Sequence, residues 1–131
     1  MFGSLKKLFG GEEKEEKIIA APVSGTAIPM GQVSDPTFSQ EILGKGTAVI
    51  PSDGRVVAPA DGLVTMVFDT KHAISMQTDN GAELIIHIGL DTVQLKGQYF
   101  EAHVAAGDKV KQGDLLLDFE IDKIKEAGYD V

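Results

Sequence analysis

The sequence of 131 residues contains no cysteine. Zinc–thiolate sites, thiol nucleophiles and redox pairs are therefore excluded within this chain. Long apolar runs are also missing, because no stretch approaches the ~20 apolar residues that a membrane span needs. Basic residues are few: 12 Lys and Arg face 20 Asp and Glu, which gives a net charge of -8. Such a surface is unsuited to neutralising phosphates, so we expect no nucleic-acid partner.

The composition is that of an ordinary globular protein, with 43% hydrophobic and 24% charged residues, and the length fits one domain with its own core. Residues 1–17 differ, since apolar residues recur at helical spacing around two lysines and a charged linker follows. They predict an amphipathic segment whose residues 1–9 rest weakly on an anionic membrane surface, with a frayed terminus as the equal alternative. No secretory signal is present, so we expect a cytoplasmic protein, peripheral at the inner face of the membrane if that segment binds.

From residue 18 onward the sequence predicts an all-β domain over 18–131. Most of the fifteen glycines and five prolines separate short apolar runs, as in an antiparallel β-sandwich or barrel. The expected strands are 18–23, 26–28, 47–50, 55–58, 63–68, 73–77, 82–88 and 115–121. Short helical turns are expected at 36–43 and 122–127, and the turn-rich stretch 106–115 suits a strand crossing at a barrel edge.

Two of the three histidines flank the strongest hairpin signal in the chain, Asn80-Gly81 between apolar runs. With these two residues as the turn, Ile74 lies opposite His87 and His72 lies opposite Gly89. Side chains on one face would then be His72, Ile74, Met76, Ile85 and His87. The two imidazole rings become diagonal neighbours that can share one ligand or one phosphoryl group.

Neutral imidazole is both a nucleophile near pH 7 and a metal ligand, so both chemistries start from His72 and His87. A metal site needs at least one further convergent ligand, and none follows at an obvious spacing. The alternative is that both histidines are ordinary surface or core residues whose ring nitrogens are hydrogen-bonded and that carry out no chemistry. His103 has no such companion and is interpreted as a bystander.

The motifs around the hairpin are long and ordered: Thr-Lys-His-Ala at 70–73, and Asn-Gly-x-Glu-Leu-x-x-His-Ile-Gly-Leu-Asp-Thr-Val-x-Leu-x-Gly at 80–97. With Ala-Pro at 21–22, the segment 33–38, Gly-Lys-Gly at 44–46 and Ala-Pro-x-x-Gly at 58–62, the sequence strongly resembles the glucose-family IIA component of the bacterial phosphoenolpyruvate:sugar phosphotransferase system. The resemblance covers about residues 18–122. It implies a flattened antiparallel β-sandwich or barrel of the duplicated hybrid motif type.

By this resemblance the protein is a phosphotransferase component with a phosphohistidine intermediate. The phosphocarrier protein HPr would phosphorylate His87, which would pass the group to a cysteine of the IIB domain of a sugar permease. His72 would stabilise the phosphoryl oxygens, and the Thr70 hydroxyl would orient His72. No cofactor is implied and no metal is required, although incidental zinc at His72 and His87 is conceivable. The sugar and any regulatory protein targets are not encoded in these residues.

The same resemblance implies a docking surface for HPr and IIB around the histidines. Its apolar members would be Val33, Phe38, Phe68, Ile74, Ile88 and Val93, and its acidic pair Asp35 and Asp91, suited to a basic partner.

The match is incomplete at the end of the chain, because family members continue beyond Val131 into further strands. We therefore expect an open sheet edge or an uncovered core face. Two other functions stay as alternatives: a lipoyl or biotinyl carrier acylated at Lys71, and a zinc hydrolase with His72 and His87 as ligands.

Overall fold

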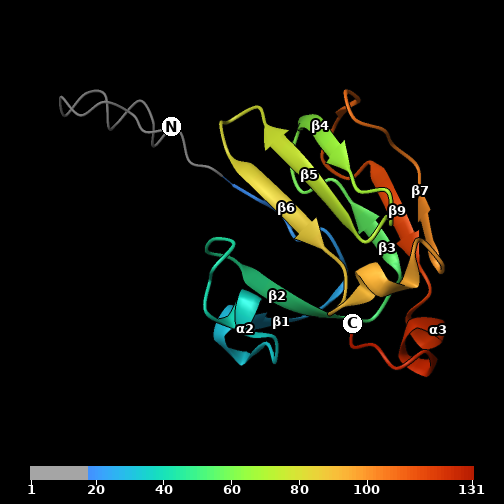
Figure 1. Cartoon of the computed structure of the whole chain (residues 1–131). Helices are drawn as coiled ribbons and strands as arrows, with labels where there is room; N and C mark the ends of the chain where they lie inside the picture. Colours follow the sequence, from blue (N-terminus) through green and yellow to red (C-terminus); the bar gives the residue numbers. More distant parts are fainter. Residues whose placement is uncertain (1–17) are drawn as a thin grey trace, which may run out of the picture.

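The computed structural model describes residues 18–131, so the predicted amphipathic segment 1–17 lies outside the described residues. Strands dominate the fold and are arranged in three antiparallel sheets (Figure 1). The strands are β1 (Gly25–Pro29), β2 (Thr47–Pro51), β3 (Arg55–Val57), β4 (Gly62–Val67), β5 (Ala73–Thr78), β6 (Glu83–His87), β7 (Phe100–Ala102), β8 (Lys109–Val110) and β9 (Leu115–Phe119). The helical pieces are η1 (Met30–Gln32), α2 (Pro36–Ser39), η2 (Thr92–Leu95) and α3 (Ile121–Glu126). The predicted all-β fold is confirmed.

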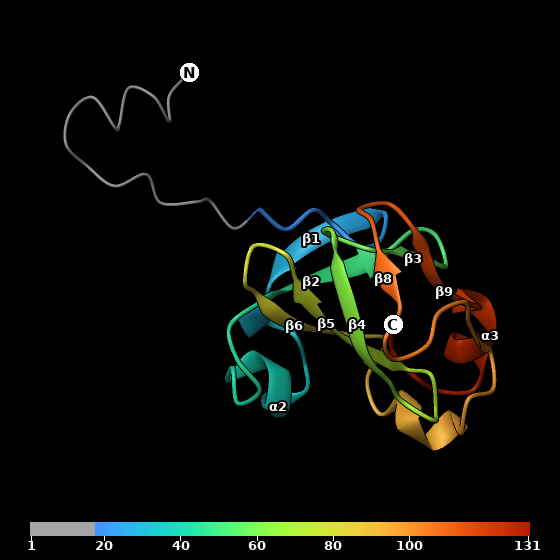
Figure 2. The same ribbon diagram turned by 90° about the horizontal axis from the view of Figure 1, so that it is seen from above.

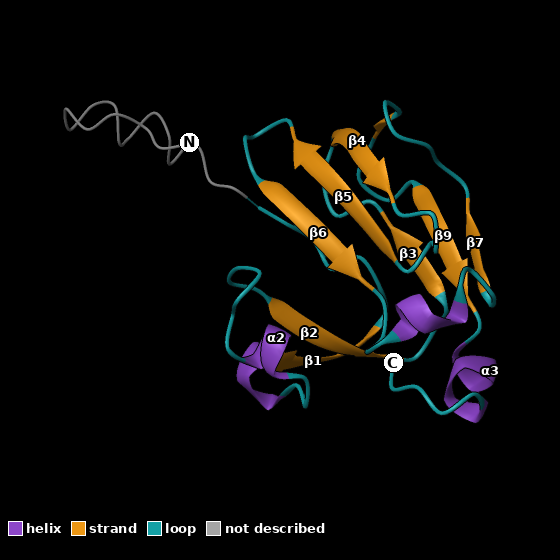
Figure 3. Ribbon diagram, viewed as in Figure 1, coloured by secondary structure: helices purple, strands orange, loops and turns teal. Residues whose placement is uncertain are grey.

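The four-stranded sheet has the order β6-β5-β4-β8 and the three-stranded sheet the order β3-β9-β7, while β1 and β2 form a separate ribbon. In Figure 1 this ribbon and α2 lie below β6, the strand that ends at His87. The helices are short and lie at the margins (Figure 3), with α2 and α3 on opposite sides of the molecule in the view from above (Figure 2). Among residues 18–131, no helix is long and apolar enough to cross a membrane.

Most expected strands are present, but three details differ. Residues 18–23 form no strand; they run beside the sheets through isolated hydrogen bonds, from Ala20 N to the Pro59 carbonyl and from Val57 N to the Pro22 carbonyl. β7 was not predicted, because three residues are too few to show an alternating pattern. The helix expected at 36–43 ends at Ser39, whereas α3 lies close to its expected place.

The predicted register of the β5–β6 hairpin is wrong by one residue. Thr78 N donates to the Ala82 carbonyl, so three residues, 79–81, form the loop in place of two. The loop ends in Gly81 at φ 91°, the left-handed position that a three-residue hairpin gives to glycine. His87 consequently pairs with Ala73, not Ile74, and Ile74 pairs with Ile86.

This shift divides the predicted apolar patch, because Ile74 and Met76 face the core. Ile74 is fully buried, at 0% exposure, and Ile88 is 5% exposed, so the expectation that both are docking residues is wrong. Ile85 lies on the other face and is 42% exposed. The two sheets share one core, which comprises Val56, Val64, Ile74, Met76, Ile88, Phe100, Val110, Leu116, Leu117, Phe119 and Ile124 together with Ala58.

A second irregularity changes the direction of side chains on β4. The pairing with β5 shifts between Val64 and Met66, so Thr65 is an extra residue in β4. Beyond this bulge Met66 lies opposite Ser75, and Phe68 N donates to the Ala73 carbonyl. Phe68 therefore reaches the same end of the sheet as His87.

Ile74→Ala should lower the free energy of unfolding by about 2–5 kcal/mol, because it leaves a cavity in a closed core. Ile85→Ala, on the neighbouring strand, should change it by less than about 0.5–1 kcal/mol. Urea unfolding of both variants measures this. Equal losses would contradict the observed register.

Candidate functional site

The histidine site lies where β4, β5 and β6 meet the loops at one end of the four-stranded sheet. A tight turn connects β4 to β5: Lys71 N donates to the Phe68 carbonyl at 2.7 Å, and Lys71 has a left-handed φ of 58°. His72 follows this turn and precedes the first residue of β5. Its carbonyl still accepts a hydrogen bond from Ile88 N at 2.7 Å, so the backbone pairing with β6 continues to this residue. The His72 ring nevertheless reaches His87 despite the shifted register.

The two imidazole rings lie edge to face, with centroids 4.9 Å apart and planes at 85°. His72 is buried and His87 is half-buried. The hydroxyl of Thr70 lies 2.6 Å from Nδ1 of His72, within hydrogen-bonding distance. The structure thus brings together the three residues that the sequence selected for chemistry.

The loop after His87 is held by contacts that leave no room for a side chain at Gly89. Gly89 has a φ of 76°, and a Cβ there would clash with Cγ2 of Thr92 and lie 2.8 Å from the Asp130 carbonyl oxygen. The Thr92 hydroxyl donates to the Ile88 carbonyl, and Leu90 N donates to the Asp130 carbonyl at 3.0 Å. The last residues of the chain therefore help to fix the loop that follows the half-buried histidine.

Burial lowers the pKa of His87 below the ordinary histidine value of 6.5, and the neighbouring His72 lowers it further. The Gly89 backbone and the carboxylates of Asp35 and Asp91 oppose this shift in the pKa without cancelling it. The pKa of His72 is also lowered by burial. Both rings are therefore neutral near pH 7, the form in which imidazole is a nucleophile.

Two phenylalanines flank the histidine pair. Phe38, from α2, lies with its ring centroid 4.7 Å from that of His87, and the Phe68 ring lies 5.4 Å from His72. Asp35 caps α2 by accepting a hydrogen bond from Thr37 N, which places the helix and its phenylalanine beside the site.

The other predicted docking residues divide by exposure. Val93 is 44% exposed on η2 and Val33 is half-buried, whereas Ile74 and Ile88 are in the core. Sequence reasoning left out Met66, which is 49% exposed and lies in one cross-strand row with Ser75 and Ile85. The alternation along β6 indicated Ile85, which shares its face with His87, but no pattern indicated the bulge that turns Met66 outward.

His103, interpreted as a bystander, lies beyond the end of β7 in the other sheet, with Nε2 2.8 Å from a carboxylate oxygen of Asp118. Of the residues described, one group of three could hold a metal ion, and neither His72 nor His87 belongs to it.

Comparison with known proteins identifies the family. The model of the phosphoenolpyruvate-dependent sugar phosphotransferase system, EIIA 1, matches residues 17–131. The chain belongs to this family. Its members are phosphotransferase components, so the chain is a phosphoryl carrier of sugar uptake. The two alternatives, a lipoyl or biotinyl carrier and a zinc hydrolase, are not supported.

Relatives agree over most of the chain. The glucose-specific EIIA component of Halalkalibacterium halodurans is 50% identical over 129 residues, which cover 92% of this chain and 75% of the relative. The beta-glucoside-specific EIIBCA component of Bacillus subtilis is 50% identical over 119 residues, 91% of this chain and 20% of the relative. The solved glucose permease IIA from Mycoplasma capricolum superposes with a TM-score of 0.81 at 37% identity, over 86% of this chain and 74% of that one.

The EIIBCA relative joins an EIIA part to EIIB and EIIC parts in one chain. EIIA-family chains thus work with a IIB-containing permease, the partnership expected from the sequence.

The lowered pKa values predict how stability depends on pH. Since burial holds the pKa of His72 and His87 below 6.5, the unfolded chain binds more protons than the folded chain once the pH falls through 6.5. The free energy of unfolding should therefore fall from about pH 7.5 to 5.5, and less steeply when both histidines are changed to glutamine. Urea unfolding across this range tests it, and parallel curves for the two proteins would contradict it.

Proposed function

We propose that His87 accepts a phosphoryl group from phospho-HPr and passes it to a cysteine of a IIB domain. A neutral ring nitrogen of His87 attacks phosphorus, the bond to the donor breaks, and its electron pair leaves with the donor. In the second step the IIB thiolate attacks phosphorus, and the electron pair of the P–N bond returns to the His87 ring. The group moves between proteins without a nucleotide.

The observation that carries this proposal is the edge-to-face pair of neutral imidazoles, 4.9 Å apart, with one ring buried and the other half-buried. Of the two, His87 is the acceptor because it is the more accessible, and a partner must reach the phosphorus. Its lowered pKa keeps the attacking nitrogen unprotonated at neutral pH.

His72 has the complementary role of stabilising the phosphoryl oxygens. Its buried ring faces His87 and cannot itself meet a partner protein. The Thr70 hydroxyl 2.6 Å from its Nδ1 fixes the ring, which leaves Nε2 for the phosphoryl group. A hydrogen-bond donor placed in advance stabilises the transition state with little reorganisation.

The docking face around the site comprises Phe38, Phe68, Met66, Ile85 and Val93, with Val33 at its margin and Asp35 and Asp91 as its acidic groups. Its apolar members are exposed or half-buried beside His87. The two carboxylates lie near enough to His87 to affect its pKa, and they suit a partner with a basic rim. HPr and IIB would use this face in turn.

The proposed donor and acceptor imply a cytoplasmic location. Glucose, the sugar in the name of the Halalkalibacterium relative, is the first candidate for the permease that this chain serves. Regulatory protein targets and membrane contact through residues 1–9 stay predictions.

Phosphoryl transfer can be followed with labelled phosphoenolpyruvate, enzyme I and HPr. The wild-type chain should acquire acid-labile, base-stable label, and His87→Gln should acquire none. His72→Gln should still accept label from HPr but transfer it to a IIB domain about 10²–10³-fold more slowly, since it removes one stabilising donor. Thr70→Ala should slow the second step by less.

Unchanged onward transfer by His72→Gln would remove His72 from the mechanism. Label on His87→Gln would place the acceptor elsewhere.

Docking variants separate binding from chemistry. Ile85→Ser and Met66→Ser should raise the KM for phospho-HPr several-fold while the maximal rate changes little, because they remove contact area that is the same before and during transfer. Ile19→Ser is the matched control: Ile19 is 44% exposed, and the neighbouring Ala20 N bonds to the Pro59 carbonyl, near the end of β4 remote from His87. A control with the same rise in KM would refute the assignment of this face.

A further inference from the structure

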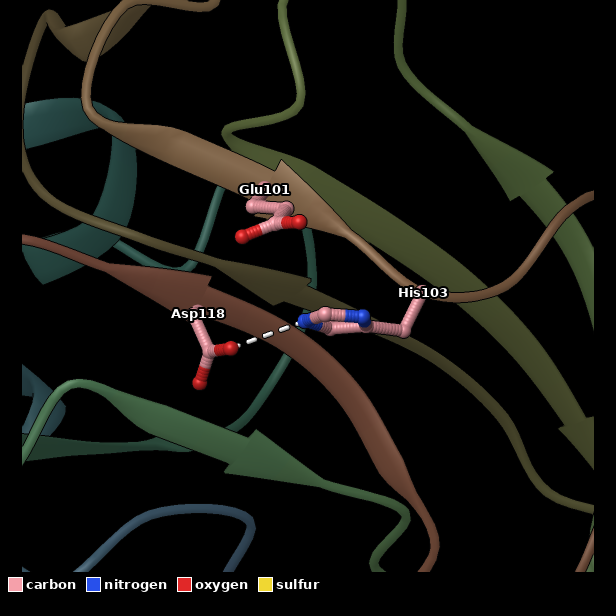
Figure 4. Close-up of side chains that lie close together, drawn as sticks. All are labelled: Glu101, His103 and Asp118. Carbon is pink, nitrogen blue, oxygen red and sulfur yellow. Dashed lines mark hydrogen bonds and ion pairs between the residues drawn. The ribbon is translucent and has the colours of Figure 1, made fainter.

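A cluster of three potential ligands lies on the three-stranded sheet, apart from the histidine pair. Glu101 on β7 and Asp118 on β9 are direct cross-strand partners, and His103 N continues the ladder by donating to the Leu116 carbonyl. One ligand atom from each of Glu101, His103 and Asp118 lies within 4.8 Å of the others. In Figure 4 the His103 ring extends toward Asp118, and the Glu101 carboxylate lies beside them on the adjacent strand.

The pairing of Glu101 with Asp118 is electrostatically unfavourable by itself. Like charges directly opposite each other in a sheet destabilise it. Nε2 of His103 meets one oxygen of Asp118 at 2.8 Å, and Arg55 is the partner of Asp118 on the opposite strand, β3. The Glu101 carboxylate lies in the same cluster, where a divalent cation would neutralise both acidic groups.

We propose that Glu101, His103 and Asp118 bind Zn²⁺. One imidazole nitrogen with two carboxylate oxygens suits a borderline metal better than Mg²⁺ or Ca²⁺, which take oxygen ligands only. Metal–ligand distances of about 2.0–2.2 Å put tetrahedral ligand atoms about 3.3–3.5 Å apart. The exposed Glu101 side chain can close this gap by a change of rotamer, since it is free to move in solvent. Three protein ligands leave a fourth position for water.

Metal binding here would connect β7 to β9, the central strand of its sheet. Any ligand that binds the folded chain and not the unfolded one raises stability. Zn²⁺ should therefore raise the Tm of the chain.

The test is a calorimetric titration with Zn²⁺ in a His72→Gln/His87→Gln background, which removes the other two imidazoles. One ion should bind per chain and raise the Tm. If titration of this double variant with Zn²⁺ releases or absorbs no more heat than titration of buffer alone, the proposal is wrong.

Single changes then assign the ligands. Three single variants, His103→Gln, Glu101→Gln and Asp118→Asn, should each weaken Zn²⁺ binding at least about tenfold. Even the loss of a residue that only hydrogen-bonds to a metal ligand lowers metal affinity about 10–100-fold. Glu126→Gln, an exposed carboxylate on α3, is the matched control and should bind as the background does. Spectra of the free variants establish that each is folded. Unchanged affinity in His103→Gln would mean adventitious carboxylate binding and would refute the site.

Discussion

The register between β5 and β6 is the constraint on which the rest of the structure depends. The hydrogen bond from Thr78 N to the Ala82 carbonyl fixes it at the hairpin loop. Ile74 and Met76 then enter the core at 0% and 1% exposure, while Ile85 and His87 take the opposite face. Because side chains alternate with a period of two, a slip of one residue would bury Ile85 and His87 and expose the core residues of one strand.

The register alone does not bring the two histidines together. Strict alternation puts residue 72 on the face of Ile74, opposite to that of His87, so the turn before β5 has to redirect the ring. The left-handed Lys71 and the hydroxyl of Thr70 provide this turn and its anchor. On the other side, Gly89 and the Asp130 carbonyl hold the loop after His87. The site therefore depends on two loops at one end of a sheet more than on the strands themselves.

The sequence predicts the all-β class and most strands because their apolar runs end at glycine, proline or Asn-Gly. It does not determine the loop length, since Asn80-Gly81 suits a two-residue turn and a three-residue loop with Gly81 left-handed equally well. The two-residue turn therefore places Ile74 wrongly on the face of His87, whereas the family resemblance is what suggests Ile88 as a docking residue, and both are buried. The bulge at Thr65 has no local signal, so Met66 was missed. The register that predicts His72 and His87 as neighbours is wrong, yet the two rings meet because the turn before β5 brings His72 to His87. The resemblance to the family, which does not depend on the register, indicates the same two histidines and Thr70.

Opposing electrostatic effects meet at His87. Burial and the His72 ring lower its pKa and make the nitrogen available, while Asp35 and Asp91 raise the pKa and limit the loss of basicity. A strongly lowered pKa would give a poor nucleophile, since a weak base attacks phosphorus slowly. The same two carboxylates would repel an incoming phosphoryl group, so the proposed acceptor needs a hydrogen-bond donor close by. In the proposed mechanism this donor is His72, which is buried, is anchored by Thr70 and has its ring centroid 4.9 Å from that of His87, so the transfer would use both imidazoles.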